Sequence, residues 1–478
     1  MNVPSLPFFG FAAAVALLIN LSGKAAWRRC VLLAANLAFV LSFSHSPRQL
    51  LPFALLLLYG FLAVKLLERR KDRIAFWFLT ALALAGFCWL KRYSFVPSGL
   101  LLPYAYFTVG MSYVFFRVMH LIIDTYQGDL EEPVDALSYA NFTLNFTSLV
   151  SGPIQFYRDY RRTESEEPAK LDAAVAWPAL ERIALGFFKV SIVSTLLSHA
   201  QHLVVASLAG PLGSVERILA AAALVALFPV YLYANFSGYM DVVIGVARFL
   251  RLDLPENFNN PLVSTGFIEL WNRWHMTLST WLKTYVYSPL LLGLIRAFPS
   301  PSLEPYFGVF AYFVTFFLVG AWHGQTPAFL FLGVMYGLGT SANKLYQIAM
   351  VGRLGRARYR SLCAKNWYVV LSRGLTFTWF GVSMLWFWSD WGQLATYVRA
   401  LGVPAVLSGI VLTIVTGGTV LSMILRLERP VRGFAVAGRR IFDSPYVRTA
   451  LTTVIVTLTF SVTVLLRAPA ARIVYKGF

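Results

Sequence analysis

Apolar runs dominate the sequence, and short polar or basic segments separate them. Several runs reach the roughly 20 residues that cross the hydrocarbon core of a bilayer, and the shorter ones indicate buried, tilted or re-entrant pieces. The pattern predicts an all-α polytopic membrane protein with about eleven transmembrane helices. The runs are residues 6–22, 31–43, 50–67, 74–90, 100–123, 179–198, 216–234, 306–322, 328–339, 366–388, 403–424 and 446–466.

One apolar stretch is too long to form a single straight helix across a membrane. Residues 306–339 would run about 50 Å as one helix, against roughly 30 Å of hydrocarbon. Only the segment HGQTP at 323–327 interrupts the stretch. Gly324 and Pro327 therefore predict a break, which places His323 in or near the membrane. A histidine at such a break is a candidate functional residue, and a structural core histidine is the alternative.

Polar residues collect in the region 235–327, which begins NFSGYMDVV with Asn235 and Asp241. Asp241 lies in an apolar stretch and shares a helical face with Arg248, seven residues further on. The two residues predict either a functional site or a structural ion pair inside the bundle. The segment LPENFNNP at 254–261 has two prolines around a polar core, so we expect a loop.

The segment WNRWHMTLSTWLKTY at 271–285 predicts an amphipathic helix. At 100° per residue, Trp271, Trp274 and His275 fall on one aromatic face, while Asn272 and Arg273 fall on the polar face. Such a helix either lies flat in the membrane interface or borders a central cavity with its tryptophan face inward. The interfacial alternative explains the basic residues, but a histidine on the buried face needs a partner.

Composition supports a membrane protein and gives its orientation. Only 13 % of the residues are charged, against about 25 % in soluble domains. The net charge of +19 comes from basic clusters between apolar runs, which follows the positive-inside rule and does not indicate nucleic-acid binding. The first apolar run is followed by Lys24, Arg28 and Arg29, so we expect both termini outside the cytoplasm. The polar stretch 158–172 is expected to be a cytoplasmic loop.

The tryptophan segment and the later WHG at 322–324 resemble the membrane-bound O-acyltransferase (MBOAT) family. The resembling branch is the bacterial one with the alginate O-acetylation and teichoic-acid D-alanyl transfer proteins. Supporting stretches are NFSGYMDVVIGVARFL, PENFNNP, SGPIQFYRDY and IIDTYQGDL. The resemblance divides the chain into N-terminal transmembrane helices at 1–94, a catalytic core at 95–345 and C-terminal transmembrane helices at 346–478.

By this resemblance, the helices surround a central funnel or tunnel in the bacterial cytoplasmic membrane. A thioester donor, acyl-CoA or an acyl carrier protein, comes from the cytoplasm, and no cofactor stays bound. The acceptor is a hydroxyl of an extracytoplasmic polymer, or a periplasmic acyltransferase partner relays the acyl group. Acetyl-transferring members commonly carry a GGNR-like motif where this chain reads LLGLIRAFPS, so acetyl and D-alanyl groups both stay open.

The same resemblance assigns roles to the polar residues. His323 matches the intramembrane histidine of the family and is the expected catalytic base, with His275 assisting on the donor. The expected substrate-binding residues are Trp271, Asn272, Arg273, Trp274, Trp322, Asn235 and Asp241.

The chemistry of acyl transfer agrees with these residue types. A base that takes the hydroxyl proton contributes about 10²–10⁴ in rate, and a desolvated histidine stays neutral and able to accept it. Asn272, Arg273 or an indole N–H are candidate donors to the oxyanion. No metal is expected, since the three cysteines follow no metal spacing. A secondary transporter and a non-catalytic scaffold of an envelope-polymer system are the alternatives, although transporters usually show two related halves.

Overall fold

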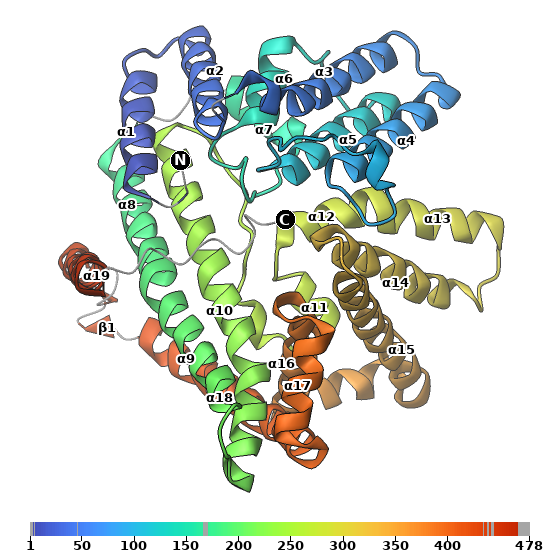
Figure 1. The fold of residues 1–478 in the computed structure, drawn as a ribbon, viewed down its shortest axis with the longest axis vertical. Helices are drawn as coiled ribbons and strands as arrows, with labels where there is room; N and C mark the ends of the chain where they lie inside the picture. The colour runs from blue at the N-terminus through green and yellow to red at the C-terminus, as the bar shows by residue number, and fades with distance from the viewer. Residues whose placement is uncertain are drawn as a thin grey trace. The chain divides into compact units, whose positions relative to one another are not determined.

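The computed structural model describes residues 3, 5–44, 46–165, 171–433, 435–436, 439–440 and 444–466. Within these residues the secondary structure is helical apart from two strands of two residues each, β1 (Ala435–Val436) and β2 (Arg439–Arg440) (Figure 1). The prediction of an all-α chain is therefore confirmed. The described residues form two compact units: unit 1 holds those up to 187 together with 238–256, and unit 2 holds 188–237 and those from 257 onward.

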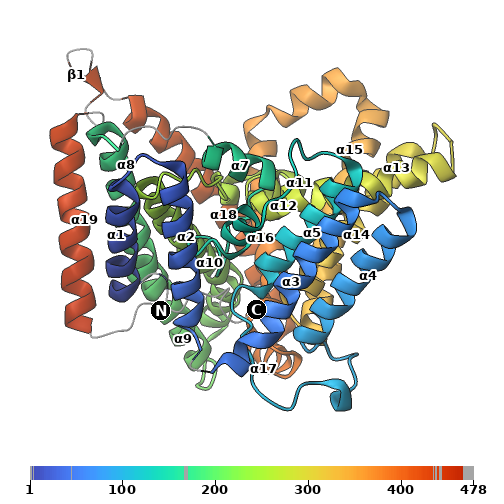
Figure 2. The same ribbon diagram turned by 90° about the horizontal axis from the view of Figure 1, so that it is seen from above.

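Unit 1 is built from a run of consecutive helices, and it also receives the end of α10 (Ser214–Phe249). In chain order the helices are α1 (Leu6–Asn20), α2 (Ala25–Leu41), α3 (Pro47–Arg69), α4 (Arg73–Leu90), η1 (Ser98–Leu100), α5 (Met111–Gln127), α6 (Ala136–Leu144), α7 (Tyr157–Ser165) and α8 (Ala173–Phe188). Helices α3, α4 and α5 pack on one another (Figure 2).

A buried arginine organises the centre of unit 1. Arg117 on α5 is 1 % exposed, and its guanidinium donates to the carbonyls of Phe142, Thr143 and Ser148 and to Ser148 Oγ. A buried cation is costly unless its donors find acceptors. These acceptors fix the chain where α6 ends and the next segment begins.

The start of the polar stretch 158–172 is helical, so the predicted loop is wrong there. Helix α7 ends near Glu164, which is 5 % exposed and accepts hydrogen bonds from Ser138 and Arg161. Arg29 of α2 lies 3.3 Å from the same carboxylate. A buried carboxylate needs such partners, and the helix brings Arg161 and Glu164 onto one side. Residues 166–170 lie outside the described part.

Unit 2 contains the first part of α10 and most of the remaining elements. They are η2 (Lys189–Val193), α9 (Ser194–Ser207), η3 (Pro261–Val263), α11 (Phe267–Trp271), α12 (Met276–Leu282), η4 (Lys283–Tyr287), α13 (Ser288–Ala297), α14 (Glu304–His323), α15 (Pro327–Cys363), α16 (Asn366–Trp388), α17 (Trp391–Leu401), α18 (Val403–Gly433) and α19 (Pro445–Leu466).

The described residues contain six helices long and apolar enough to cross a membrane. Shorter apolar helices cover Pro7–Asn20 and Tyr446–Val462. The predicted total of about eleven and the central funnel stay predictions, as do the divisions at residues 94 and 345. The six segments are Pro47–Arg69, Arg73–Leu90, Ala173–Ser207, Ser214–Phe249, Glu304–His323 and Val403–Leu427.

Helices α14 and α15 lie side by side (Figure 1) and form the most extensive helix pair among the described residues. Glycines let their backbones touch. A Cβ atom built on Gly320 would lie 2.2 Å from the nitrogen and 2.3 Å from the Cα of Gly333. A Cβ on Gly333 would lie 2.4 Å from the carbonyl oxygen of Phe317. Small residues at both positions are typical of close helix packing in membranes.

We predict that Gly320→Ala destabilises the protein. The added methyl would meet backbone atoms, and overpacking typically costs about 1–3 kcal/mol. The apparent melting temperature of detergent-solubilised protein should fall. Gly352→Ala on α15 is the control, because a Cβ there meets nothing within 4 Å. Equal melting temperatures for the two variants would contradict the backbone contact.

Candidate active site

His275 and His323 both contact the indole of Trp322 in unit 2. The ring centroids of His275 and Trp322 are 6.3 Å apart, and those of Trp322 and His323 are 4.7 Å apart. The two histidines are only 1 % and 3 % exposed, and Trp322 is 8 % exposed. Three of the predicted site residues, from two distant parts of the sequence, therefore form one buried group.

His323 is the last residue of α14, as the sequence predicted. Gly324 continues in an extended conformation, and α15 begins at Pro327. A Cβ on Gly324 would overlap the ring of Phe329, so glycine allows the chain to turn closely there. The predicted break in the long apolar stretch is confirmed, and Phe387 packs on the imidazole at 5.2 Å between ring centroids.

The predicted continuous helix over 271–285 is wrong. Helix α11 ends at Trp271 and α12 begins at Met276, while His275 has a left-handed backbone with φ 45° and ψ 51°. Arg273 and Met276 pair with the loop that precedes the segment. The N–H of Asn259 donates to Arg273 O, and the N–H of Met276 donates to Asn257 O, both at 2.9 Å. The predicted loop is confirmed, and its pairing with Met276 replaces the helical hydrogen bond that Met276 would otherwise donate to Asn272.

Asn257 holds His275, and sequence reasoning missed it. Its Oδ1 accepts from the backbone N–H of Thr277 at 3.1 Å and from the Thr277 hydroxyl at 2.8 Å. His275 Nδ1 lies 3.2 Å from the same oxygen. Asn257 is fully buried, and its Nδ2 has no hydrogen-bond partner among the residues that the structure describes. The one available signal was the asparagine-rich stretch NFNNP at 257–261, which does not reveal a contact with His275.

These contacts determine the tautomer of His275. The amide of Asn257 must present its oxygen to Thr277, because its NH₂ group would otherwise face the backbone N–H of Thr277, which can only donate. Nδ1 of His275 therefore donates, and Nε2 carries the lone pair. His275 lies outside the six candidate spans, and burial lowers its pKa to about 3. The imidazole is thus neutral and basic at Nε2 near neutral pH.

The tryptophans of the segment pack inward. The ring of Trp271 lies 4.8 Å from Phe316 and 4.9 Å from Tyr336 between centroids, and Trp274 lies 5.0 Å from Phe380. The indole Nε1 of Trp271 is buried and has no hydrogen-bond partner among the described residues. The two indoles are buried, as expected of an inward face, but they belong to separate elements, and the central cavity beside them stays a prediction.

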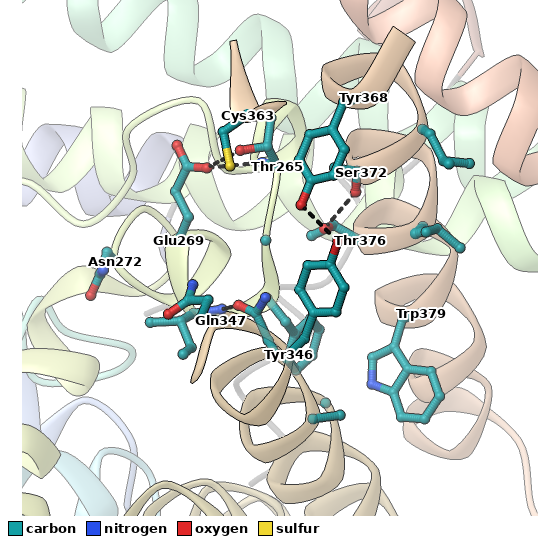
Figure 3. Close-up of a pocket in the computed structure, with 18 of the residues that line it drawn as sticks. Thr265, Glu269, Asn272, Tyr346, Gln347, Cys363, Tyr368, Ser372, Thr376 and Trp379 are labelled. Carbon is teal, nitrogen blue, oxygen red and sulfur yellow. Dashed lines mark hydrogen bonds between the residues drawn. The ribbon is translucent and has the colours of Figure 1, made fainter. Parts of the chain in front are cut away.

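The polar residues of the segment point elsewhere. Arg273 forms an ion pair with Glu269 at 2.8 Å, so its charge is already neutralised. Asn272 lines a cavity of about 750 Å³ in unit 2 (Figure 3). Neither histidine is among the residues that line this cavity.

Two further predicted site residues lie on α10, and each has a polar partner on an earlier helix. Asn235 of α10 is fully buried, with Nδ2 3.5 Å from the hydroxyl of Ser194. Asp241 belongs to unit 1 and pairs with Arg182 at 3.1 Å, whereas Arg248 pairs with Asp253. The predicted ion-pair partner of Asp241 is therefore wrong, although an Asp–Arg pair exists. The described residues contain no group of three or more His, Cys, Asp or Glu that could hold a metal.

Comparison with known protein families matches residues 81–371 to the family described as MBOAT, membrane-bound O-acyltransferase family. The chain belongs to this family. As an MBOAT protein it is a multi-pass membrane protein, and the two histidines with Trp322 lie inside the matched region.

Similar curated proteins come from several bacteria. The teichoic acid D-alanyltransferase of Bacillus subtilis is 26 % identical over 270 residues, which cover 56 % of this chain and 65 % of that protein. The probable alginate O-acetylase of Pseudomonas fluorescens is 32 % identical over 251 residues, covering 52 % and 46 %. That of Azotobacter vinelandii is 29 % identical over 302 residues, covering 62 % and 56 %. The chain thus spans about half to two thirds of the length of these relatives.

We predict that Asn257→Asp makes acyl transfer, the activity that family membership leads us to propose, sensitive to pH. A carboxylate beside Nδ1 favours the imidazolium, so the pKa of His275 rises and Nε2 loses its lone pair as the pH falls. The rate at pH 5.5 should drop roughly threefold or more against pH 8, beyond any drop in the natural protein. The measurement is the rate of thioester consumption across this pH range.

Asn259→Asp is the matched control for this variant. It adds the same charge to the same loop, but the Asn259 side chain is exposed. Its pH profile should follow that of the unmodified protein. If Asn257→Asp and Asn259→Asp had the same profile, Asn257 would not set the protonation of His275.

Proposed function

We propose that this chain is a membrane O-acyltransferase of the bacterial cytoplasmic membrane. It moves an acetyl or D-alanyl group from a cytoplasmic thioester to a hydroxyl of an extracytoplasmic envelope polymer, or to a periplasmic partner that relays the group. The observation that carries the proposal is the buried group of His275, Trp322 and His323 inside the region that matches the family. The similarity to a teichoic acid D-alanyltransferase supports a D-alanyl group as the one transferred, and the similarity to alginate O-acetylases supports an acetyl group.

His323 is the proposed base. It takes the proton of the acceptor hydroxyl while the oxygen attacks the thioester carbon. The tetrahedral intermediate then collapses, the carbon–sulfur bond breaks, and the imidazolium returns its proton to the leaving thiolate. The position of His323 at the break between α14 and α15 supports this role, because backbone breaks in a membrane are tolerated where protein or a watery cavity surrounds them.

His275 assists by binding and orienting the donor. Its lone pair at Nε2 offers an acceptor, while Asn257 keeps Nδ1 engaged. The buried N–H groups of Trp271 Nε1 and Asn257 Nδ2 are candidate donors to the oxyanion, since neither has an acceptor among the described residues. Arg273 is the weaker candidate because Glu269 already pairs with it.

The donor is acyl-CoA or an acyl carrier protein, no cofactor stays bound and no metal takes part. Membrane lipids surround the protein, and nucleic acid is not a partner. The alternatives are a secondary transporter and a non-catalytic scaffold. A transporter would move substrate across the membrane without consuming a thioester. A scaffold would neither move substrate nor consume a thioester. Acyl transfer by purified protein with donor and acceptor separates the three.

We predict that His323→Ala lowers acyl transfer at least about 100-fold, because a general base contributes about 10²–10⁴ in rate. Expression and donor binding should stay nearly unchanged. His275→Ala should weaken donor use and lower turnover. The measurement is the steady-state rate at several donor concentrations.

His202→Ala is the control, because His202 is an exposed histidine on α9. It should transfer acyl groups at the normal rate. A His323→Ala protein that kept more than about a tenth of the activity would lack the loss expected for a base.

We also predict that both termini lie outside the cytoplasm. The basic residues Lys24–Arg29 and Arg426–Arg440 then face inward, in accord with the positive-inside rule. The terminal residues 1–2 and 467–478 lie outside the described part of the chain. Reporter fusions at each terminus should be active only on the extracytoplasmic side, and a fusion within 353–360 should be active only in the cytoplasm. A cytoplasmic signal from either terminus would contradict this topology.

A further inference from the structure

The cavity of about 750 Å³ in unit 2 is an open groove between α11, α15 and α16 (Figure 3). Four of the large side chains that line it are exposed at the surface of the protein. They are Tyr346, Leu371, Leu375 and Trp379. Exposed apolar side chains of a membrane protein contact the acyl chains of lipids, which are as apolar as leucine. The groove therefore opens towards lipid.

The two long helices of the groove run in opposite directions. At one end the hydroxyl of Tyr368 donates to that of Tyr346 at 3.2 Å, and at the other a Cβ on Gly339 would lie 2.4 Å from Trp379 Nε1. Figure 3 shows Tyr368 and Cys363 towards the first end and Trp379 towards the second. Along α16 these two ends are about 16 Å apart, at 1.5 Å per residue. This length is close to half of the ~30 Å hydrocarbon core, which is the depth of one leaflet.

The lining offers hydrogen-bond donors and no unpaired negative charge. The side-chain amides of Asn343 and Gln347 face the groove, and amide N–H groups donate to ester and phosphate oxygens. Glu269 is the one carboxylate among the described residues that line the groove. It accepts from the N–H and the hydroxyl of Thr265, and it pairs with Arg273 at 2.8 Å. An anionic ligand would therefore meet no uncompensated carboxylate in the groove.

Unpaired positive charge lies at the first end of the groove. Helix α15 changes direction at Gly355, where φ is 74° and ψ is 159°. In the helical segment that follows, Arg356, Tyr359, Arg360 and Cys363 are spaced three, four and seven residues apart, so they share one face. Tyr359 and Cys363 line the groove. The two arginines are exposed, and neither forms an ion pair with a residue that the structure describes. Guanidinium groups of this kind bind phosphate well.

Trp367 marks the level of this end in the membrane. It lies on the first turn of α16, and its indole is exposed. Exposed tryptophans gather where the hydrocarbon meets the lipid head groups. The topology that we predict places residues 353–360 on the cytoplasmic side, whose leaflet carries the anionic lipids. The arginines then lie at the depth of the lipid phosphates, and the exposed leucines of α16 lie at the depth of the acyl chains.

We propose that the groove binds one anionic phospholipid of the cytoplasmic leaflet. Its phosphate pairs with Arg356 and Arg360, and its glycerol ester groups lie against the amide side chains. One acyl chain follows Leu371 and Leu375 towards Trp379. A soluble phosphate compound would satisfy the arginines but would leave the apolar end of the groove uncovered. The order of cationic, polar and apolar surface over the depth of one leaflet therefore favours a lipid.

The bound lipid stabilises the packing around α11. Residues Phe267 and Ile268 of this helix line the groove, and the helix ends at Trp271. Neither histidine of the candidate active site lines the groove, so the lipid supports the chain that leads into the tryptophan segment and is not itself a substrate there. A ligand that binds only the folded state raises stability, and this effect does not depend on the proposed acyl transfer.

The two native cysteines Cys363 and Cys30 provide the test. Cys363 lines the groove, while Cys30 is exposed in unit 1 and serves as the internal control. The protein is labelled with a maleimide in phosphatidylcholine bilayers, with and without phosphatidylglycerol of the same acyl chains. Phosphatidylglycerol at about a fifth of the lipid should slow labelling of Cys363 about fivefold and leave Cys30 unchanged. Native mass spectrometry in detergent should retain one phosphatidylglycerol molecule per chain in preference to phosphatidylcholine.

Variants of the same turn separate a site from general surface charge. Arg356→Gln with Arg360→Gln should raise the phosphatidylglycerol fraction for half-protection about tenfold. The matched control is Arg353→Gln with Arg358→Gln, which removes the same charge from the same turn. Arg353 precedes the change of direction, and Arg358 lies on the opposite side of the segment from Arg356, so half-protection should shift less than about twofold. Ala342→Trp, which fills the groove, should abolish lipid retention in native mass spectrometry.

Three outcomes would overturn the proposal. Equal labelling of Cys363 with and without phosphatidylglycerol would show that no anionic lipid covers the groove. Equal shifts for the two double variants would assign the effect to the surface potential of the whole turn. Protection by glycerol 3-phosphate or acetyl-CoA in pure phosphatidylcholine would assign the groove to a soluble phosphate compound. None of these measurements needs turnover, so they succeed or fail independently of His323 as the base.

Discussion

Asn257 Oδ1 accepts three hydrogen bonds from a stretch of three residues, and the geometry of the histidine group depends on this single oxygen. The bonds from Thr277 hold the start of α12 against the loop, and the bond from His275 Nδ1 holds the imidazole. The left-handed backbone at His275 is costly for a residue with a Cβ, so surrounding contacts must maintain it. Because the oxygen is fully buried, leaving its donors unsatisfied would be expensive. Backbone conformation and protonation state are thus set together.

The two histidines share contact with the indole of Trp322, but each imidazole has different further surroundings. His275 is neutral because it is desolvated, and it has a hydrogen-bonding partner at Nδ1. His323 lies closer to the indole, with an angle of 52° between the ring planes. His323 also packs on Phe387, at 5.2 Å between ring centroids. The two histidines of one buried group can therefore have different chemical roles.

The sequence predicts what depends on local chemistry. Gly324 and Pro327 correctly predicted that α14 ends at His323. The apolar stretch 306–339 is longer than the hydrocarbon core of a bilayer, so one straight helix could not cover it. The loop at LPENFNNP was predictable as well, because two prolines bracket its polar core. The break at 272–275 could not be foreseen, because helical periodicity gives no information about the backbone of a loop 14 to 19 residues earlier. Asp241 likewise pairs with Arg182, 59 residues away, instead of the nearer Arg248. Non-local partners decided each of these cases.

The closely packed glycines of α14 and α15 have a consequence for variation within the family. Gly320 lies three residues before His323, less than one helical turn away, and its contact with Gly333 joins main chain to main chain. The backbone contact between the two helices therefore positions the imidazole of His323, and the shapes of neighbouring side chains do not. An apolar side chain near His323 can therefore be replaced by another without moving the backbone that carries the imidazole.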